Sequence, residues 1–156
     1  MKTAGIEYEE GGVEKLEIIK PLWEKLNFYH LKKATNFKEH YEQLSYEVRI
    51  KSIVEKSVTG DVAVLLAKDM AAGAYIGYCI CTEERDGTGE VESLFVDESY
   101  RGMGIGECLM EKALAWLASM GTKSYKIVVA EGNEGVFRFY EKFGFYHRSS
   151  VLTKKA

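Results

Sequence analysis

Residues 101–106 read Arg-Gly-Met-Gly-Ile-Gly, a glycine-rich run that could hold a phosphate group. Glycine lets the backbone approach a ligand closely, and a helix that begins after such a loop offers unpaired N–H groups with partial positive charge. Gly104 and Gly106 are not followed by the third glycine of a dinucleotide-binding loop, and the P-loop pattern occurs nowhere in the chain. The run therefore predicts a phosphate cradle of another type.

Three further ionisable side chains stand in patterned segments. Glu90 and Glu92 are two positions apart in a predicted strand, which puts both carboxylates on one face. Tyr140 belongs to an apolar stripe at helical spacing, on or beside a buried face. The alternatives are solvated surface carboxylates and a core tyrosine whose hydroxyl bonds a neighbour. The stripe comprises Val136, Phe139, Tyr140 and Phe143.

Apolar, β-branched and aromatic runs between glycines and charges predict the strands that position these groups. The strand before the loop is residues 89–96, entered through the turn Asp86-Gly87. The other predicted strands are residues 6–8, 62–67, 74–82, 125–130 and 145–152.

Helical spacing of apolar residues predicts four helices. The first starts at Val13 and should kink or restart at Pro21, the only proline. The second covers residues 37–56, with Asn36 as its cap. The third follows the glycine loop and ends at Gly121, and the fourth covers residues 134–143. The order β-α-α-β-β-β-α-β-α-β predicts an α/β fold with a mixed, mostly antiparallel sheet and helices on both faces.

Composition limits the class of protein. The 156 residues, 46% apolar and 29% charged, predict one globular domain, residues 1–156. No apolar run approaches the ~20 residues of a membrane span, and no signal-peptide pattern opens the chain. Three cysteines without zinc spacing argue against a disulfide framework or a metal site and favour a cytoplasmic location. A net charge of −3 without a basic stripe argues against nucleic-acid binding.

Two motifs and the element order resemble the GNAT superfamily of N-acetyltransferases. Arg101, Gly104 and Gly106 match its R-x-x-G-x-G signature, and residues 133–145 are similar to N-x-x-A/S-x-x-F/L-Y-x-x-x-G-F. The resemblance covers the whole chain in element order and is specific from about residue 90 to residue 145. Val136 replaces a usual small residue, and Glu98 stands where proline is frequent.

The resemblance implies acetyl-coenzyme A as acyl donor. Residues of the glycine loop would contact its pyrophosphate, backbone groups of the strand before the loop would pair with its pantetheine arm, and the residue-133 motif would add further contacts. These expected cofactor residues are Arg101, Gly102, Met103, Gly104, Ile105, Gly106; Leu94, Phe95, Val96; and Asn133, Phe139, Tyr140.

It also implies a mechanism. Glu92, or alternatively Glu90, would take the acceptor's proton through a water, and Tyr140 would protonate the leaving thiolate. The Val96 N–H is the expected donor to the thioester oxygen.

Residues 91–96 and 129–131 look closest to the diamine (spermidine/spermine, thialysine) acetyltransferase branch, which has an acidic residue where Ser93 stands. Residues 61–100 carry nine acidic and two basic side chains, which favours a small cationic amine as acceptor.

The alternatives are a protein or peptide amine, or a non-catalytic acyl-coenzyme A sensor. A homodimer is expected by analogy with the family. Candidate walls of the acceptor pocket are Trp23, Phe28, Tyr29, Tyr41 and Tyr46.

Overall fold

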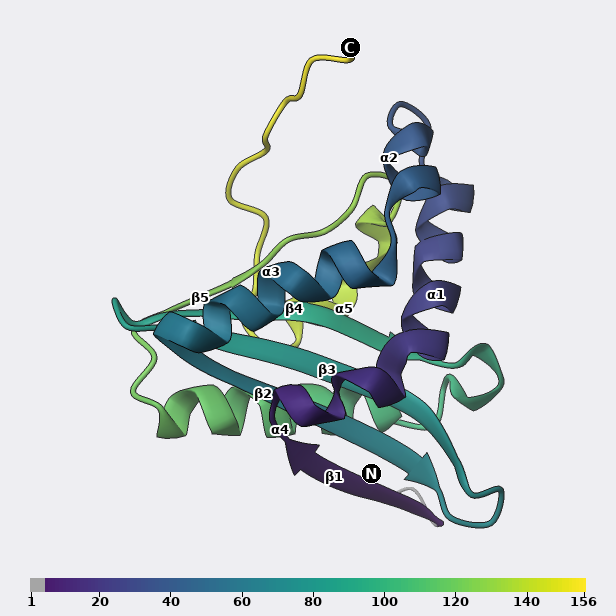
Figure 1. Ribbon diagram of the computed structural model, residues 1–156, viewed down its shortest axis with the longest axis vertical. Helices are drawn as coiled ribbons and strands as arrows, with labels where there is room; N and C mark the ends of the chain where they lie inside the picture. The colour runs from purple at the N-terminus through teal and green to yellow at the C-terminus, as the bar shows by residue number, and fades with distance from the viewer. Residues whose placement is uncertain (1–4) are drawn as a thin grey trace.

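The computed structural model describes residues 5–156, so residues 1–4 of the predicted domain lie outside the described residues. Within residues 5–156, five strands form one sheet in the order β1-β2-β3-β4-β5 (Figure 1). Three strand pairs are antiparallel, and β4 and β5 are parallel, so the predicted mixed and mostly antiparallel sheet is confirmed. The strands are β1 Ile6–Gly11, β2 Gly60–Asp69, β3 Ala74–Glu84, β4 Thr88–Val96 and β5 Ser124–Ile127.

Helices cover both faces of this sheet, as the element order predicts (Figure 1). One core lies between the sheet and α1 (Leu16–Lys33) with α3 (Tyr46–Thr59), around Ile19, Ile53 and Tyr78. The other lies between the sheet and α4 (Ile105–Ser119), around Leu109, Leu117 and Cys79. The short elements are α2 Lys38–Gln43, α5 Phe137–Glu141, and the 3-10 turns η1 Val13–Lys15, η2 Glu98–Tyr100 and η3 Glu134–Val136.

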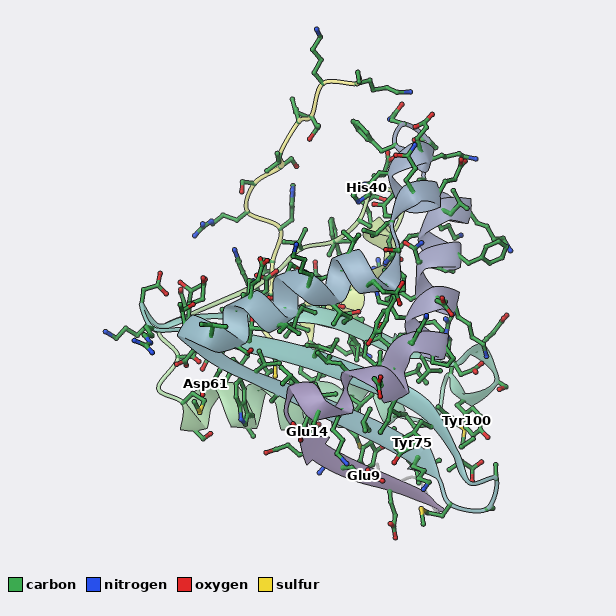
Figure 2. The ribbon with its side chains drawn as sticks, in the orientation of Figure 1. Glu9, Glu14, His40, Asp61, Tyr75 and Tyr100 are labelled. Atoms are coloured by element: carbon green, nitrogen blue, oxygen red, sulfur yellow. The ribbon has the colours of Figure 1, made fainter. Side chains whose placement is uncertain are left out.

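A hydrogen bond between polar side chains also joins β1 to β3. The Tyr75 hydroxyl at the start of β3 donates to Glu9 of β1 at 3.0 Å, and the two side chains are labelled in Figure 2. Among residues 5–156, no helix is long and apolar enough to cross a membrane.

The predicted second helix is wrong as one piece. The chain forms α2 and α3 instead, separated at Leu44 and Ser45. Ser45 caps α3, because its hydroxyl accepts a hydrogen bond from the Val48 N–H at 3.2 Å. Asn36 is not the cap: its backbone N–H, like that of Phe37, donates to Glu131. The break turns α3 along the sheet, whereas α2 stays with α1 (Figure 1).

Pro21 lies inside α1 without interrupting it, so the helix does not restart there. The first turns run along the sheet before the rest of α1 rises away from it (Figure 1), a bend that fits the loss of one backbone donor near the helix start.

The predicted strand at residues 145–152 is wrong. This segment has neither helix nor strand and runs away from the sheet (Figure 1). Its apolar side chains stay in solvent, with Val151 and Leu152 more than nine-tenths exposed. The predicted strand at residues 125–130 is confirmed only as far as Ile127. With four residues in β5, the neighbouring edge offers little backbone for another strand to pair with.

Candidate functional site

The strands β4 and β5 separate halfway along β4. Their parallel pairing runs from Thr88 with Ser124 to Val91 with Ile127 and then ends. On its other side β4 remains paired with β3 as far as Val96 and Gly77. A cleft of about 370 Å³ lies at this separation. Its walls are Leu26, His30, Tyr41, Arg49, Glu90, Val91, Glu92, Ser93, Leu94, Ile127, Val128, Val129, Ala130, Asn133, Val136 and Tyr140.

A β-bulge at Glu92 accompanies the separation. Val91 pairs with Cys81 and Ser93 pairs with Ile80, so Glu92 is the additional residue in β4. Glu90 and Glu92 both contact Lys56 of α3, which confirms that they share a face. Ser93 also faces that side, since its hydroxyl is 2.8 Å from the Tyr78 hydroxyl. The bulge therefore concentrates polar groups on the α3 side of the cleft.

Glu92 is held by three donors. Its side chain is 3% exposed; Oε1 accepts from Arg49 Nη2 at 3.2 Å, and Oε2 accepts from Lys56 Nζ at 2.5 Å and Thr82 Oγ1 at 2.6 Å. Burial alone would raise the pKa of this carboxyl, but the hydrogen bonds and the two cations outweigh it and hold the pKa below its usual value. Glu92 is an ionised, fully engaged carboxylate.

Glu90 is less enclosed. Its side chain is 13% exposed, and its two ion pairs, with Lys56 at 3.2 Å and Lys126 at 3.7 Å, both use Oε1. Lys56 thus bridges the two carboxylates, and burial, which would lower the pKa of its ammonium, is outweighed by them, so that the pKa is raised. Among the contacts of the described residues, none uses Glu90 Oε2.

The glycine loop has the backbone that a phosphate cradle needs. Gly102 and Gly104 adopt φ of +78° and +81°, values that favour glycine, and Gly104 precedes the first residue of α4. The first N–H groups of a helix have no partner inside it. A Cβ on Gly106 would lie 3.5 Å from the Phe139 ring and 3.8 Å from Val96, so the loop packs against both. The residues present fit a pyrophosphate at this helix start.

Arg101 is turned toward β4. Its Nε donates to the Val96 carbonyl at 3.0 Å, and its guanidinium lies over the rings of Tyr29 and Phe95 at 5.8 and 5.5 Å. Of the two acidic residues beside the loop, Asp97 is paired with Lys25 at 2.7 Å, and Glu98 is exposed.

Tyr140 forms part of the cleft wall from α5. Its ring packs edge-on against Phe139 and Phe145. Burial raises the pKa of its phenol, with a smaller contribution from Cys79. No group within residues 5–156 hydrogen-bonds its hydroxyl, so the core-tyrosine alternative lacks the polar neighbour it requires.

The segment between β5 and α5 closes one side of the cleft. Asn133 lines it and precedes η3 without a side-chain capping bond. The Glu131 carboxylate accepts from the Phe37 N–H at 2.6 Å and the Asn36 N–H at 3.2 Å. These bonds fix the segment to the turn between α1 and α2.

Of the five candidate aromatic walls, Tyr41 lies in the cleft, beside His30 at 5.7 Å between ring centroids. Trp23 and Tyr46 belong to the core, and Phe28 is 59% exposed. His30 Nδ1 is buried without a partner among the described residues, and burial lowers the pKa of its imidazole. His30 therefore adds an uncharged wall to the cleft.

The structure brings together Glu90, Glu92, Leu94, Asn133 and Tyr140 in the cleft. Phe95, Val96, Phe139 and residues 101–106 lie outside its lining. Gly106 is close to Phe139 and Val96, and the Arg101 guanidinium lies over the Phe95 ring. Sequence reasoning missed Arg49, Lys56 and His30. A signal existed for the first two: they are seven positions apart, which puts them on one helix face with the spacing to reach two carboxylates.

Comparison with known proteins identifies relatives by sequence. An uncharacterized N-acetyltransferase of Methanocaldococcus jannaschii is 30% identical over 86 residues, 51% of this chain and 38% of that protein. A mycothiol acetyltransferase of Propionibacterium freudenreichii is 31% identical over 88 residues, 54% of this chain and 28% of that protein. The matched segment thus spans about a third of the length of these curated relatives.

Similarity extends to the fold. The PaiA N-acetyltransferase of Thermoplasma acidophilum, solved in complex with coenzyme A, superimposes with a TM-score of 0.72 at 22% identity, covering 94% of this chain and 92% of that one. The family model described as the acetyltransferase (GNAT) family matches residues 23–145. The match includes the separated strands, the glycine loop and the Tyr140 helix, and the chain belongs to the acetyltransferase (GNAT) family.

Proposed function

We propose that this protein transfers the acetyl group of acetyl-coenzyme A to a primary amine of a small acceptor by direct attack in a ternary complex. One observation carries the proposal: Tyr140 and Glu90 both line the cleft between β4 and β5. Family membership supplies the reaction class.

The donor would bind along β4 and the glycine loop. The pyrophosphate would take the N–H groups at the start of α4, where the helix dipole favours anions. Backbone groups of Leu94, Phe95 and Val96 lie beyond the last β5 pair, so an extended pantetheine arm could use them. The coenzyme A bound in the Thermoplasma neighbour supports this choice of donor.

Acetyl-coenzyme A supplies the thioester and a thiolate leaving group. The Tyr140 hydroxyl would donate a proton to that thiolate. Two observations support this role: Tyr140 lines the cleft, and no described residue forms a hydrogen bond with its hydroxyl. A tyrosine phenol with its ordinary pKa of ~10 is protonated at neutral pH, so the proton is present when the thiolate forms.

For the proton acceptor, the contacts favour Glu90 over Glu92. Each oxygen of Glu92 already accepts from a cation, which lowers its basicity. Both ion pairs of Glu90 use one oxygen, so the other can hold the water through which a base would act. The cations Arg49 and Lys56 would also disfavour the ammonium form of a bound amine and so ease its deprotonation.

The same charges bear on the acceptor. Around the cleft, Glu90 and Glu92 form ion pairs with Arg49, Lys56 and Lys126, so the charge of these two acidic side chains is neutralised there. The cleft therefore favours an acceptor with one amine over a diamine or polyamine.

A thiol-release assay tests the proposal. Acetyl-coenzyme A is incubated with polyamines, diamines, amino acids, aminoglycosides, mycothiol-type amines and peptides, and free thiol is measured. Turnover with any amine supports the enzyme. Tight coenzyme A binding with no turnover across the panel would instead favour the acyl-coenzyme A sensor.

A further inference from the structure

We propose that Arg49 is a positioning residue, which fixes the bulge of β4 and thereby sets the strand backbone that receives the acetyl donor. The inference deepens the proposed function and rests on it for its kinetic consequences. In this inference, Arg49 of α3 influences catalysis through the position of β4 and does not touch the reacting atoms.

One nitrogen of Arg49 donates hydrogen bonds both to the main chain and to the side chain of the same residue. Nη2 donates to the Glu92 carbonyl at 2.9 Å and to Glu92 Oε1 at 3.2 Å. A bulge leaves its additional residue without a regular ladder partner. Arg49 supplies that partner from a helix.

Arg49 is itself held in place. Nη1 donates to Ser52 Oγ at 3.2 Å, and Ser52 Oγ donates to the Arg49 carbonyl at 2.8 Å. The residue lies in the first turn of α3, whose start is fixed by the Ser45 cap. Its side chain is 24% exposed and that of Glu92 is 3% exposed, so the pair is shielded from solvent more than a surface ion pair.

Lys56 and Thr82 hold Glu92 differently. Both contact Oε2, and among the described contacts Lys56 binds carboxylates only. Removing Lys56 would change the charge around Glu92 but leave the bulge carbonyl bonded to Arg49. The two cations of α3 are therefore separable by experiment.

The bulge sets which way the last residues of β4 face. Ser93 and Phe95 face the α1 and α3 side, whereas Leu94 and Val96 pack on the α4 side. A shift of one residue in the strand would exchange these faces. Even a smaller displacement would move the backbone of residues 94–96 relative to Tyr140, and a misplacement of about 1 Å can cost about a hundredfold in rate.

The experiment compares Arg49→Met, Arg49→Lys and Lys56→Met in the full chain. The matched control is Lys20→Met, which removes the cation of an exposed ion pair, 3.0 Å from Glu47, between α1 and α3. For Arg49→Met we expect kcat to fall more than tenfold, coenzyme A binding to weaken, and amide hydrogen exchange of residues 92–96 to accelerate. Arg49→Lys should recover part of each, and Lys56→Met should leave the exchange of these amides unchanged.

Hydrogen exchange separates this inference from the proposed function. If Arg49→Met is folded by circular dichroism and residues 92–96 exchange as in the wild type, the positioning role is refuted, whatever the turnover. Accelerated exchange with wild-type kcat and coenzyme A affinity also refutes it. If the wild-type protein has no turnover, the proposed function fails, while faster exchange and weaker coenzyme A binding in Arg49→Met would still support the positioning of the strand.

Discussion

Gly132 lies so close to the end of α1 that a Cβ on it would stand 2.2 Å from the Lys33 carbonyl oxygen. Its φ of +82° belongs to the region that favours glycine. Next to it, Glu131 bonds the backbone of the turn between α1 and α2. This contact joins the wall of the cleft that comes after β5 to the wall formed by α1.

Gly132→Ala should therefore destabilise the protein by about 1–3 kcal/mol, because it adds strain at positive φ and a backbone clash. Urea unfolding measures the change. Gly135→Ala is the control, since Gly135 has no neighbour within 4 Å of a Cβ and no positive φ. Equal effects of the two changes would contradict the close contact at Gly132.

Tyr140→Phe should lower kcat about 10²- to 10⁴-fold and leave coenzyme A affinity nearly unchanged, because it removes a proton donor while keeping the ring. Steady-state thiol release and calorimetric titration with coenzyme A measure the two quantities. Tyr146→Phe serves as the control, since that side chain is 73% exposed. Full activity in Tyr140→Phe would exclude the general-acid role.

Gly104→Val should weaken coenzyme A binding, because a β-branched residue at φ +81° must distort the loop before α4. Gly121→Val imposes the same kind of strain at the other end of α4, where φ is +78°. Both variants should lose stability, and only the first should lose affinity in a coenzyme A titration. A similar loss of affinity in both would show that the effect is not local to the loop.

Glu92→Gln should reduce stability at pH 7 by about 1–3 kcal/mol, because Arg49 and Lys56 lose a buried anion. The pKa of Glu92 is lowered in the folded state, so its stabilisation is present above the unfolded value near 4.5 and is lost as pH falls through the folded value. The difference between wild type and variant should therefore shrink below pH 4.5 in urea unfolding. Glu47→Gln, at an exposed pair, should change little at any pH.

Much of the fold could be predicted because local patterns and tertiary structure agree. The strands around residues 62–67, 74–82 and 89–96 and the helix after the glycine loop carry apolar periodicity that matches their burial. The C-terminal segment has the same kind of apolar residues, but β5, the strand at that edge of the sheet, ends at Ile127 after four residues. The break in the second helix is hidden because Asn36 has the residue type of a cap, whereas Ser45 makes the capping bond.

The candidate site divides in the same way. Glu90, Asn133 and Tyr140 could be found because they stand in or beside recognisable strand and helix patterns, and they line one cleft. The bulge at Glu92 could not be predicted, because a single additional residue leaves no clear mark in the two-residue alternation of side chains along a strand. The bonds from Arg49 and Lys56 join positions more than 30 residues apart, which only folding reveals.

The separation of β4 from β5 has a consequence beyond binding. From Glu92 to Val96, one side of β4 faces a cleft instead of a strand among the described residues, which leaves a strand edge inside the sheet. Such edges invite pairing with other chains. A donor lying along β4 would cover this edge, so supply of acetyl-coenzyme A should govern how readily the protein aggregates as well as how fast it turns over.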